Sequence, residues 1–211
     1  MQKIMFNDKY GLTDAVLQRR KTMTRRVIGT VEEIGLCIDR NGFAVCTVKD
    51  CGYYTGTVKS KYAIGEEVAI AQAYKNDDML TYNAYHDDGT KREDGAERHK
   101  QMLNSKGYRN KMFVRADLMP HRIRITGIKA ERLQDISDED CMKEGIYTRA
   151  ALHSLHVNGY AYTFDSWSDR GIAKGSDTAR GAFSVLIDKV SGKGTWDRNP
   201  WVFVYEFELI K

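Results

Sequence analysis

Long apolar runs are missing from this sequence of 211 residues. No stretch approaches the roughly 20 apolar residues that a membrane-spanning helix requires, and residues 1–10 hold no long apolar region. We therefore expect no membrane partner, no secretory signal and a cytoplasmic location. The GxGxxG and GxxxxGK[ST] patterns are missing too, which argues against a dinucleotide site and a P-loop.

Cysteine is scarce, and its spacing fits no metal-binding motif. The four cysteines are Cys37, Cys46, Cys51 and Cys141. None belongs to a CxxC pair, and His153 and His156 stand far from all four in the sequence. A zinc site is the weaker alternative, and we expect reduced thiols with no metal and no cofactor.

The composition is typical of a folded domain. Hydrophobic residues make up 42% of the chain and charged residues 29%, and the 12 Tyr, 7 Phe and 3 Trp argue against a disordered chain. The net charge of +4 is too small for a protein that coats a nucleic-acid duplex, but it allows a polyanionic partner where cations cluster. Five cations cluster within residues 19–26: Arg19, Arg20, Lys21, Arg25 and Arg26.

Hydrophobic periodicity predicts short helices between strands. Helices are predicted at residues 15–20 with Thr13 as N-cap, at 96–103, after Ser137 and at 182–190. Strands are predicted at residues 22–28, 68–71, 121–128 and 202–210, with turns at Asn41-Gly42 and Cys51-Gly52. Because strands dominate, we expect an α+β fold, a mixed barrel with short flanking helices rather than a doubly wound sheet.

Two features refine this pattern. Ser137 and Asp140 resemble a capping box, and Gly145 is predicted to end the helix that they begin. Residues 76–110 and 147–180 are polar and irregular, and we interpret both as insertions, the first as a mobile loop around one short helix.

Four sequence blocks stand in a characteristic order. Residues 20–26 read RKTMTRR, residues 62–66 read YAIGE, residues 133–145 read LQDISDEDCMKEG, and residues 194–210 read GTWDRNPWVFVYEFELI. The first resembles the G-[RK]-K-T-x-T-x-R signature of the ASCH domain family, and the others resemble its strand turn, its helix ending in Glu-Gly and the closing strand of phage- and prophage-borne members. The resemblance implies a PUA-like β-barrel in one domain over residues 1–211, with the two polar stretches as insertions.

The resemblance also implies a site. Small bacterial ASCH proteins are amidohydrolases that remove the acetyl group from acetylcytidine, with a Lys as proton acceptor, a Thr as nucleophile and a Glu as proton donor. The matching residues are Lys21, Thr24 and Glu144. A Lys that is neutral through burial and nearby cations is a plausible base for a Thr hydroxyl. The neighbouring residues expected to bind substrate are Arg20, Thr22, Arg25 and Arg26.

Three functions fit these features. The leading expectation is binding of RNA or a modified nucleoside, with the arginines of residues 19–26 on phosphate. The alternative is an amidohydrolase acting on the exocyclic amine of acylated cytidine. The third is a phage-related assembly or interaction module, which rests only on the closing block.

Arg19 departs from the ASCH signature, which has Gly at this position. If the position requires a positive φ, an arginine there costs on the order of 1–2 kcal/mol.

Overall fold

The structure is a computed structural model that describes residues 1–29, 33–50, 53–76, 79, 84–86, 89–148, 162–164 and 175–210. Most of the predicted insertion at 147–180 lies outside the described residues, as do the turn at Cys51-Gly52, His153 and His156. The chain divides into two compact units. Unit 1 comprises Met1–Phe6, Glu67–Arg124 and Leu209–Lys211, and unit 2 comprises Asn7–Glu66 and Ile125–Glu208.

Unit 1 is built around three paired strand segments. Strand β1 (Gln2–Ile4) runs parallel to β6 (Glu67–Ile70), and β6 pairs antiparallel with the start of β7 (Arg122–Arg132). Its helical elements are α3 (Gly95–Leu103), η2 (Lys106–Tyr108), η3 (Lys111–Phe113) and η4 (Ala116–Leu118). Helix α3 confirms the helix predicted at residues 96–103.

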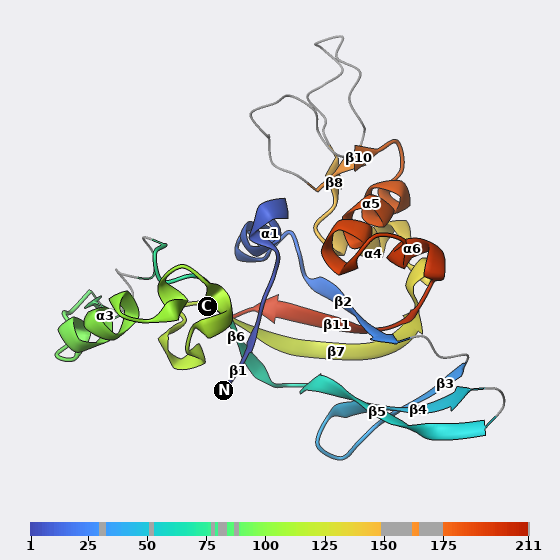
Figure 1. Ribbon diagram of the computed structural model, residues 1–211, viewed down its shortest axis with the longest axis horizontal. Coiled ribbons are helices and arrows are strands. Elements are labelled where there is room, and N and C mark those ends of the chain that lie inside the picture. Colours follow the sequence, from blue (N-terminus) through green and yellow to red (C-terminus); the bar gives the residue numbers. More distant parts are fainter. Residues whose placement is uncertain are drawn as a thin grey trace, which may run out of the picture. The chain divides into compact units, whose positions relative to one another are not determined.

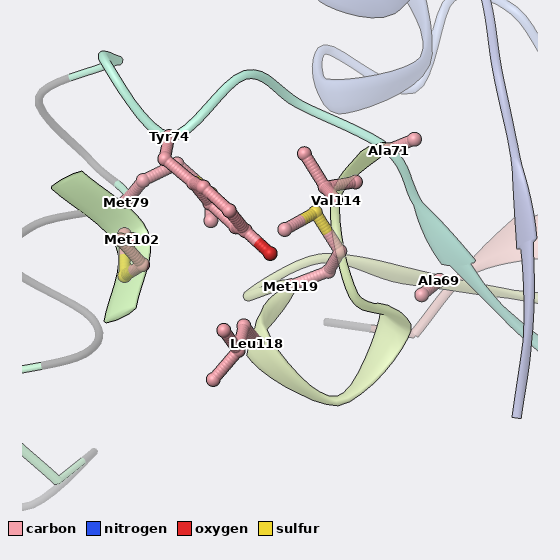
Figure 2. Packing of buried hydrophobic residues seen from close by; sticks show 8 residues of the cluster. All are labelled: Ala69, Ala71, Tyr74, Met79, Met102, Val114, Leu118 and Met119. Carbon is pink, nitrogen blue, oxygen red and sulfur yellow. The ribbon is translucent and has the colours of Figure 1, made fainter. Parts of the chain in front are cut away.

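The polar stretch at 76–110 contributes to a core of its own in unit 1. Figure 2 shows this cluster of buried residues, which comprises Ala69, Ala71, Tyr74, Met79, Met102, Val114, Leu118 and Met119. Met79 and Met102, both from the predicted insertion, are fully buried. Burial of such side chains stabilises each by about 1.5–3 kcal/mol relative to exposure, so the segment has a packing role.

Unit 2 contains the remaining elements. Its strands are β2 (Met23–Gly29), β3 (Glu33–Ile38), β4 (Phe43–Asp50), β5 (Tyr53–Ala63), β8 (Tyr147–Thr148), β9 (Tyr162–Thr163), β10 (Gly175–Ser176) and β11 (Trp201–Leu209). Its helices are η1 (Asp8–Tyr10), α1 (Leu12–Leu17), η5 (Leu133–Asp135), α4 (Asp138–Lys143), α5 (Ala179–Ser191) and α6 (Thr195–Arg198).

The strands of unit 2 form open sheets. The later part of β7, β11 and β2 lie side by side in this order, and β3-β4-β5 and β10-β9-β8 form two three-stranded sheets (Figure 1). The fold is therefore α+β, as predicted. Among the described strands no pairing closes a sheet into a barrel, so only the coarser fold class is established.

The first helix begins earlier than predicted. Helix α1 starts at Leu12 after Gly11, whose φ of 64° closes the preceding turn η1. Thr13 is therefore not the N-cap, and its hydroxyl donates a hydrogen bond to Asp8. The prediction was wrong because nothing in the local pattern shows that residues 8–10 form a 3-10 turn that starts the helix.

The other helix ends follow the sequence more closely. The Ser137 side chain accepts a hydrogen bond from Asp140 N (3.1 Å), so Ser137 is the N-cap of α4, and Gly145 follows α4 with φ of 102°, which confirms the predicted start and end of this helix. Helix α5 begins three residues earlier than predicted, with Thr178 as N-cap. Val190, in the last turn of α5, is 37% exposed.

Within the described part of the chain, no helix combines the length and apolarity needed to cross a bilayer.

The φ of Arg19 is 59°, so the position that is Gly in the ASCH signature has a left-handed conformation here. We predict that Arg19→Gly raises the free energy of unfolding by about 1 kcal/mol, because glycine adopts this conformation without a Cβ penalty. Arg20→Gly is the matched control and should lower stability, since its φ is not positive. Urea titration measures both, and equal effects of the two variants would contradict the strain at Arg19.

Candidate functional site

Lys21 lies buried between α1 and β2, with only 2% of its surface exposed. Its Nζ donates to the carbonyls of Met23 (2.8 Å) and Glu144 (2.8 Å) and to Glu144 Oε2 (2.6 Å). These three acceptors match the three protons of an ammonium group, whereas a neutral amine has only two. The geometry therefore describes a protonated resting Lys21.

Glu144 is the C-cap residue that follows α4. The glycine that follows has φ of 102°, a conformation that favours glycine, and a methyl group at Gly145 would make ordinary contacts of 3.6 Å with Lys21 Cβ and Ala15 Cβ, so α1 packs against this turn. Glu144 Oε2 accepts from Lys21, and Oε1 accepts from Arg25 Nη1 at 3.1 Å. The Glu144 side chain is 5% exposed, and its carboxylate is held by two cations.

Arg25 is the centre of a larger ion-pair network. Its guanidinium donates to Glu131 Oε1 from Nε (3.0 Å) and Nη2 (2.6 Å), and to Asp140 Oδ2 from Nη2 (3.0 Å). The side chain is fully buried, and its Cζ lies 5.9 Å from the Phe183 ring centroid. Three carboxylates, with Glu144 as the third, thus surround one guanidinium.

Lys129 completes the network at its more exposed side. Its Nζ lies 2.9 Å from Glu131 Oε2 and 3.2 Å from Asp140 Oδ2. Two buried cations (Lys21 and Arg25) and two half-exposed lysines (Lys129, and Lys143 at 3.8 Å from Asp140 Oδ1) therefore face three carboxylates (Glu131, Asp140 and Glu144). Each buried charge thus has an opposite charge beside it, as it must because an unpaired charge in the interior is strongly destabilising.

The network shifts the pKa values of its members. Burial lowers the pKa of Lys21 and outweighs the opposing effect of Glu144, and the charges of Arg26 and Arg25 lower it further. Burial also opposes the charged forms of Arg25 and Asp140. The carboxylates Glu144 and Glu131 nevertheless raise the pKa of Arg25, and hydrogen bonds from Lys129 and Arg25 lower that of Asp140.

Thr24 and Arg26 lie on the other face of β2. Successive side chains of a strand point to opposite faces, so these two residues face away from Arg25. Their partners on β11 are Tyr205 and Phe203. Thr24 is buried, but it belongs neither to the hydrogen-bond set described for Lys21 nor to that of Glu144.

The remaining substrate-binding candidates lie nearer the surface. Arg20 is exposed, and its Cζ lies 5.0 Å from the Tyr147 ring centroid. The backbone of Thr22 connects two elements, since its N–H donates to the Lys143 carbonyl and its carbonyl accepts from Phe207 N, both at 2.9 Å.

Arg25, expected to bind substrate, is instead enclosed by carboxylates and has no free face for phosphate.

The structure thus brings Lys21 and Glu144 together although they stand 123 positions apart. The sequence did not identify Lys129, Glu131 and Asp140 as part of the site. A weak signal was present, because Lys129 and Glu131 stand two residues apart and so share one face of β7, and the Asp140 N–H donates to the N-cap Ser137 of α4. In the described residues, no group of three or more His, Cys, Asp or Glu side chains is arranged to hold a metal ion.

Comparison with known proteins gives no relative: no family model, no curated protein and no solved structure matches the chain.

We predict that Arg25→Met lowers the free energy of unfolding by about 3–5 kcal/mol, because it leaves buried carboxylates without their shared cation. The matched control is Arg124→Met, which removes an arginine paired with Glu67 at the surface (3.1 Å) and should cost no more than about 1 kcal/mol. Chemical denaturation compares the two, and similar losses would mean that the network adds nothing beyond a surface ion pair.

The lowered pKa of Asp140 gives a pH prediction. A carboxylate whose pKa is depressed on folding stabilises the protein above its unfolded-state pKa of about 3.9, and this contribution is lost as pH falls through the folded-state pKa. Wild-type stability should therefore fall below about pH 4, and Asp140→Asn should show a shallower fall. Thermal melts across this range test the expectation, and parallel curves for the two proteins would refute it.

Proposed function

We propose that unit 2 is an ASCH-type module that binds RNA or a modified nucleoside. The observation that carries the proposal is the contact between Lys21 Nζ and Glu144 Oε2 at 2.6 Å. The two residues come from separate sequence blocks, and both blocks were assigned to the ASCH pattern from sequence alone. The nucleoside is expected to lie near Arg20 and Tyr147, the exposed cation and half-buried ring beside this pair.

We further propose that the open sheets of unit 2 belong to a PUA-like mixed barrel. Support comes from contacts between β11 and β5, which belong to different sheets. Tyr205 Oη accepts a hydrogen bond from Lys61 N (2.9 Å), and the Tyr205 and Tyr62 rings meet edge to face with centroids 5.3 Å apart. Two sheets whose inner faces meet through aromatic side chains are compatible with a barrel core.

A second candidate function, hydrolysis of an acylated cytidine, is favoured by the chemistry of the Lys21–Glu144 pair. Lys21 rests protonated and is therefore not yet a base. Transfer of one proton along the 2.6 Å hydrogen bond to Glu144 would give a neutral amine and a carboxylic acid. These are the two species that base and acid catalysis of amide cleavage requires.

The reaction would then run in balanced steps. Lys21 takes the proton of the Thr24 hydroxyl as Oγ1 attacks the acyl carbonyl, and the C–N bond breaks as Glu144 gives its proton to the departing amine. The pair is then again an ammonium and a carboxylate, and water attacks the acyl-threonine, releasing the acyl group as a carboxylic acid while Thr24 Oγ1 regains its proton. Thr24 must approach Lys21 for the first step, while Arg25 Nη1, 3.1 Å from Glu144 Oε1, holds the Glu144 side chain in place.

Nucleoside binding is tested by titrating the purified protein with acetylcytidine and cytidine in a calorimeter. We expect saturable binding that Glu144→Gln weakens, because this change removes the charge that orients Lys21. Val27→Thr, at an exposed position of β2, is the matched control and should bind as wild type does. Absence of binding by either nucleoside to a folded wild-type protein would refute the nucleoside proposal.

Hydrolysis is tested separately by following release of cytidine from acetylcytidine. Lys21→Arg should abolish turnover, a loss of about two to four powers of ten, because arginine retains its proton and cannot act as base. The same variant should keep part of the nucleoside binding if only a cation is needed there. Full hydrolytic activity in Lys21→Arg would rule out Lys21 as the base, and binding without hydrolysis in wild type would leave the binding function alone.

A further inference from the structure

Unit 1 carries a second cationic segment, separate from the Lys21 site. Residues 98–116 contain no Asp or Glu. They contain six Lys and Arg residues: Arg98, Lys100, Lys106, Arg109, Lys111 and Arg115. Such a one-sided stretch within a folded unit produces a local positive potential that attracts polyanions.

Some of these charges are compensated locally. Arg115 Nη2 lies 2.6 Å from Asp117 Oδ2, and Arg98 Nη1 lies 3.5 Å from Asp94 Oδ2. Lys106 and Arg109 differ, because both are exposed and no carboxylate in the described part of the chain pairs with either. Their charges are therefore available to an anionic partner.

Exposed apolar side chains lie beside these two cations. Phe113 is 51% exposed and Met112 is 58% exposed, both in the short turn η3. Lys106 Nζ lies 5.8 Å from the Phe113 ring centroid. An accessible aromatic ring next to an uncompensated ammonium group provides a surface for a base and a contact for its phosphate.

The core of unit 1 holds this surface in place. Lys3 Nζ donates to the carbonyls of Met112 (2.7 Å) and Val114 (2.6 Å), on either side of Phe113. Val114 is buried in the cluster of Figure 2, and a Cβ on Gly107 would come within 2.6 Å of the Tyr74 ring. The backbone of turns η2 and η3 is therefore held by contacts with Lys3 and Tyr74. Lys106 and Phe113 are the exposed side chains of these two turns.

We propose that residues 106–113 form a docking surface for single-stranded nucleic acid, with Phe113 stacking on a base and Lys106 and Arg109 contacting phosphates. A single strand fits better than a duplex, because bases in a duplex are already stacked and offer no face to Phe113. An anionic membrane fits less well, because membrane-binding segments use a broad apolar helix face and η3 spans only Lys111–Phe113. The inference concerns unit 1 and does not depend on the function proposed for unit 2.

The test is fluorescence anisotropy with labelled single strands of about 12 nucleotides, oligo-uridine and oligo-thymidine, and with a duplex of the same length. We expect both single strands to bind more tightly than the duplex. Phe113→Ala should weaken binding about tenfold, and Phe113→Tyr should retain it because the ring is preserved. Preference for oligo-uridine would point to RNA, and equal affinity would point to recognition that ignores the 2′-hydroxyl.

The phosphate contacts are tested by the salt dependence of the affinity. Lys106→Ala/Arg109→Ala should weaken binding and reduce the slope of log affinity against log salt by about 1–2. Lys189→Ala/Lys193→Ala removes the same charge from exposed positions of unit 2 and should leave the slope unchanged. Melting temperatures of all variants confirm folding, which the exposed positions of these side chains should preserve.

Three results would overturn the proposal. One is no binding of either single strand at low salt, and another is binding that Phe113→Ala and Lys106→Ala/Arg109→Ala leave unchanged. The third is binding of anionic phospholipid vesicles, sensitive to the same variants, without binding of oligonucleotides. Loss of nucleoside binding in Glu144→Gln with oligonucleotide binding intact would separate the two sites.

Discussion

The buried contact between Lys21 and Glu144 holds together the elements of unit 2 that form the candidate site. Lys21 follows α1, Glu144 ends α4, and the backbone of Thr22 joins the end of α4 to β11. Arg25 extends the same charge balance to Glu131 on β7 and contacts Phe183 on α5. Because removal of one partner leaves a charge buried without compensation, the network constrains every element that carries a member.

Both ends of this contact were expected from the resemblance of residues 20–26 and 133–145 to the ASCH pattern, and local caps support the position of the second. Ser137 and Gly145 mark the start and end of α4, and these caps fix where Glu144 falls. The role of Arg25 was not predicted, because its partner Glu131 lies outside the four sequence blocks that carry the resemblance. A short pattern identifies residue types, but it does not tell which face of β2 each residue occupies. That face separates Arg25 from Thr24 and decides which of them meets the carboxylates.

The fold shows the same division between local and long-range information. Strand β11 and helix α5 were recognised because each repeats its hydrophobic pattern over nine or more residues. Residues 76–110 were interpreted from their polar composition, yet Met79 and Met102 are fully buried with Tyr74. Only a few apolar residues build this core, and short 3-10 turns bring them together. The overall composition of a segment does not show that a few of its apolar residues are buried together.

Pairing within the fold also determines which cations can contact a polyanion. The densest cluster in the sequence, residues 19–26, includes Lys21 and Arg25, whose charges are matched by carboxylates from residues 131–144. Residues 98–116 are less conspicuous, but Lys106 and Arg109 have no such match in the described part of the chain. Attraction of a polyanion depends on charge that remains after internal pairing, because a compensated ion pair produces little field at a distance. Charge density along a sequence therefore predicts a phosphate contact only where the fold supplies no carboxylate of its own.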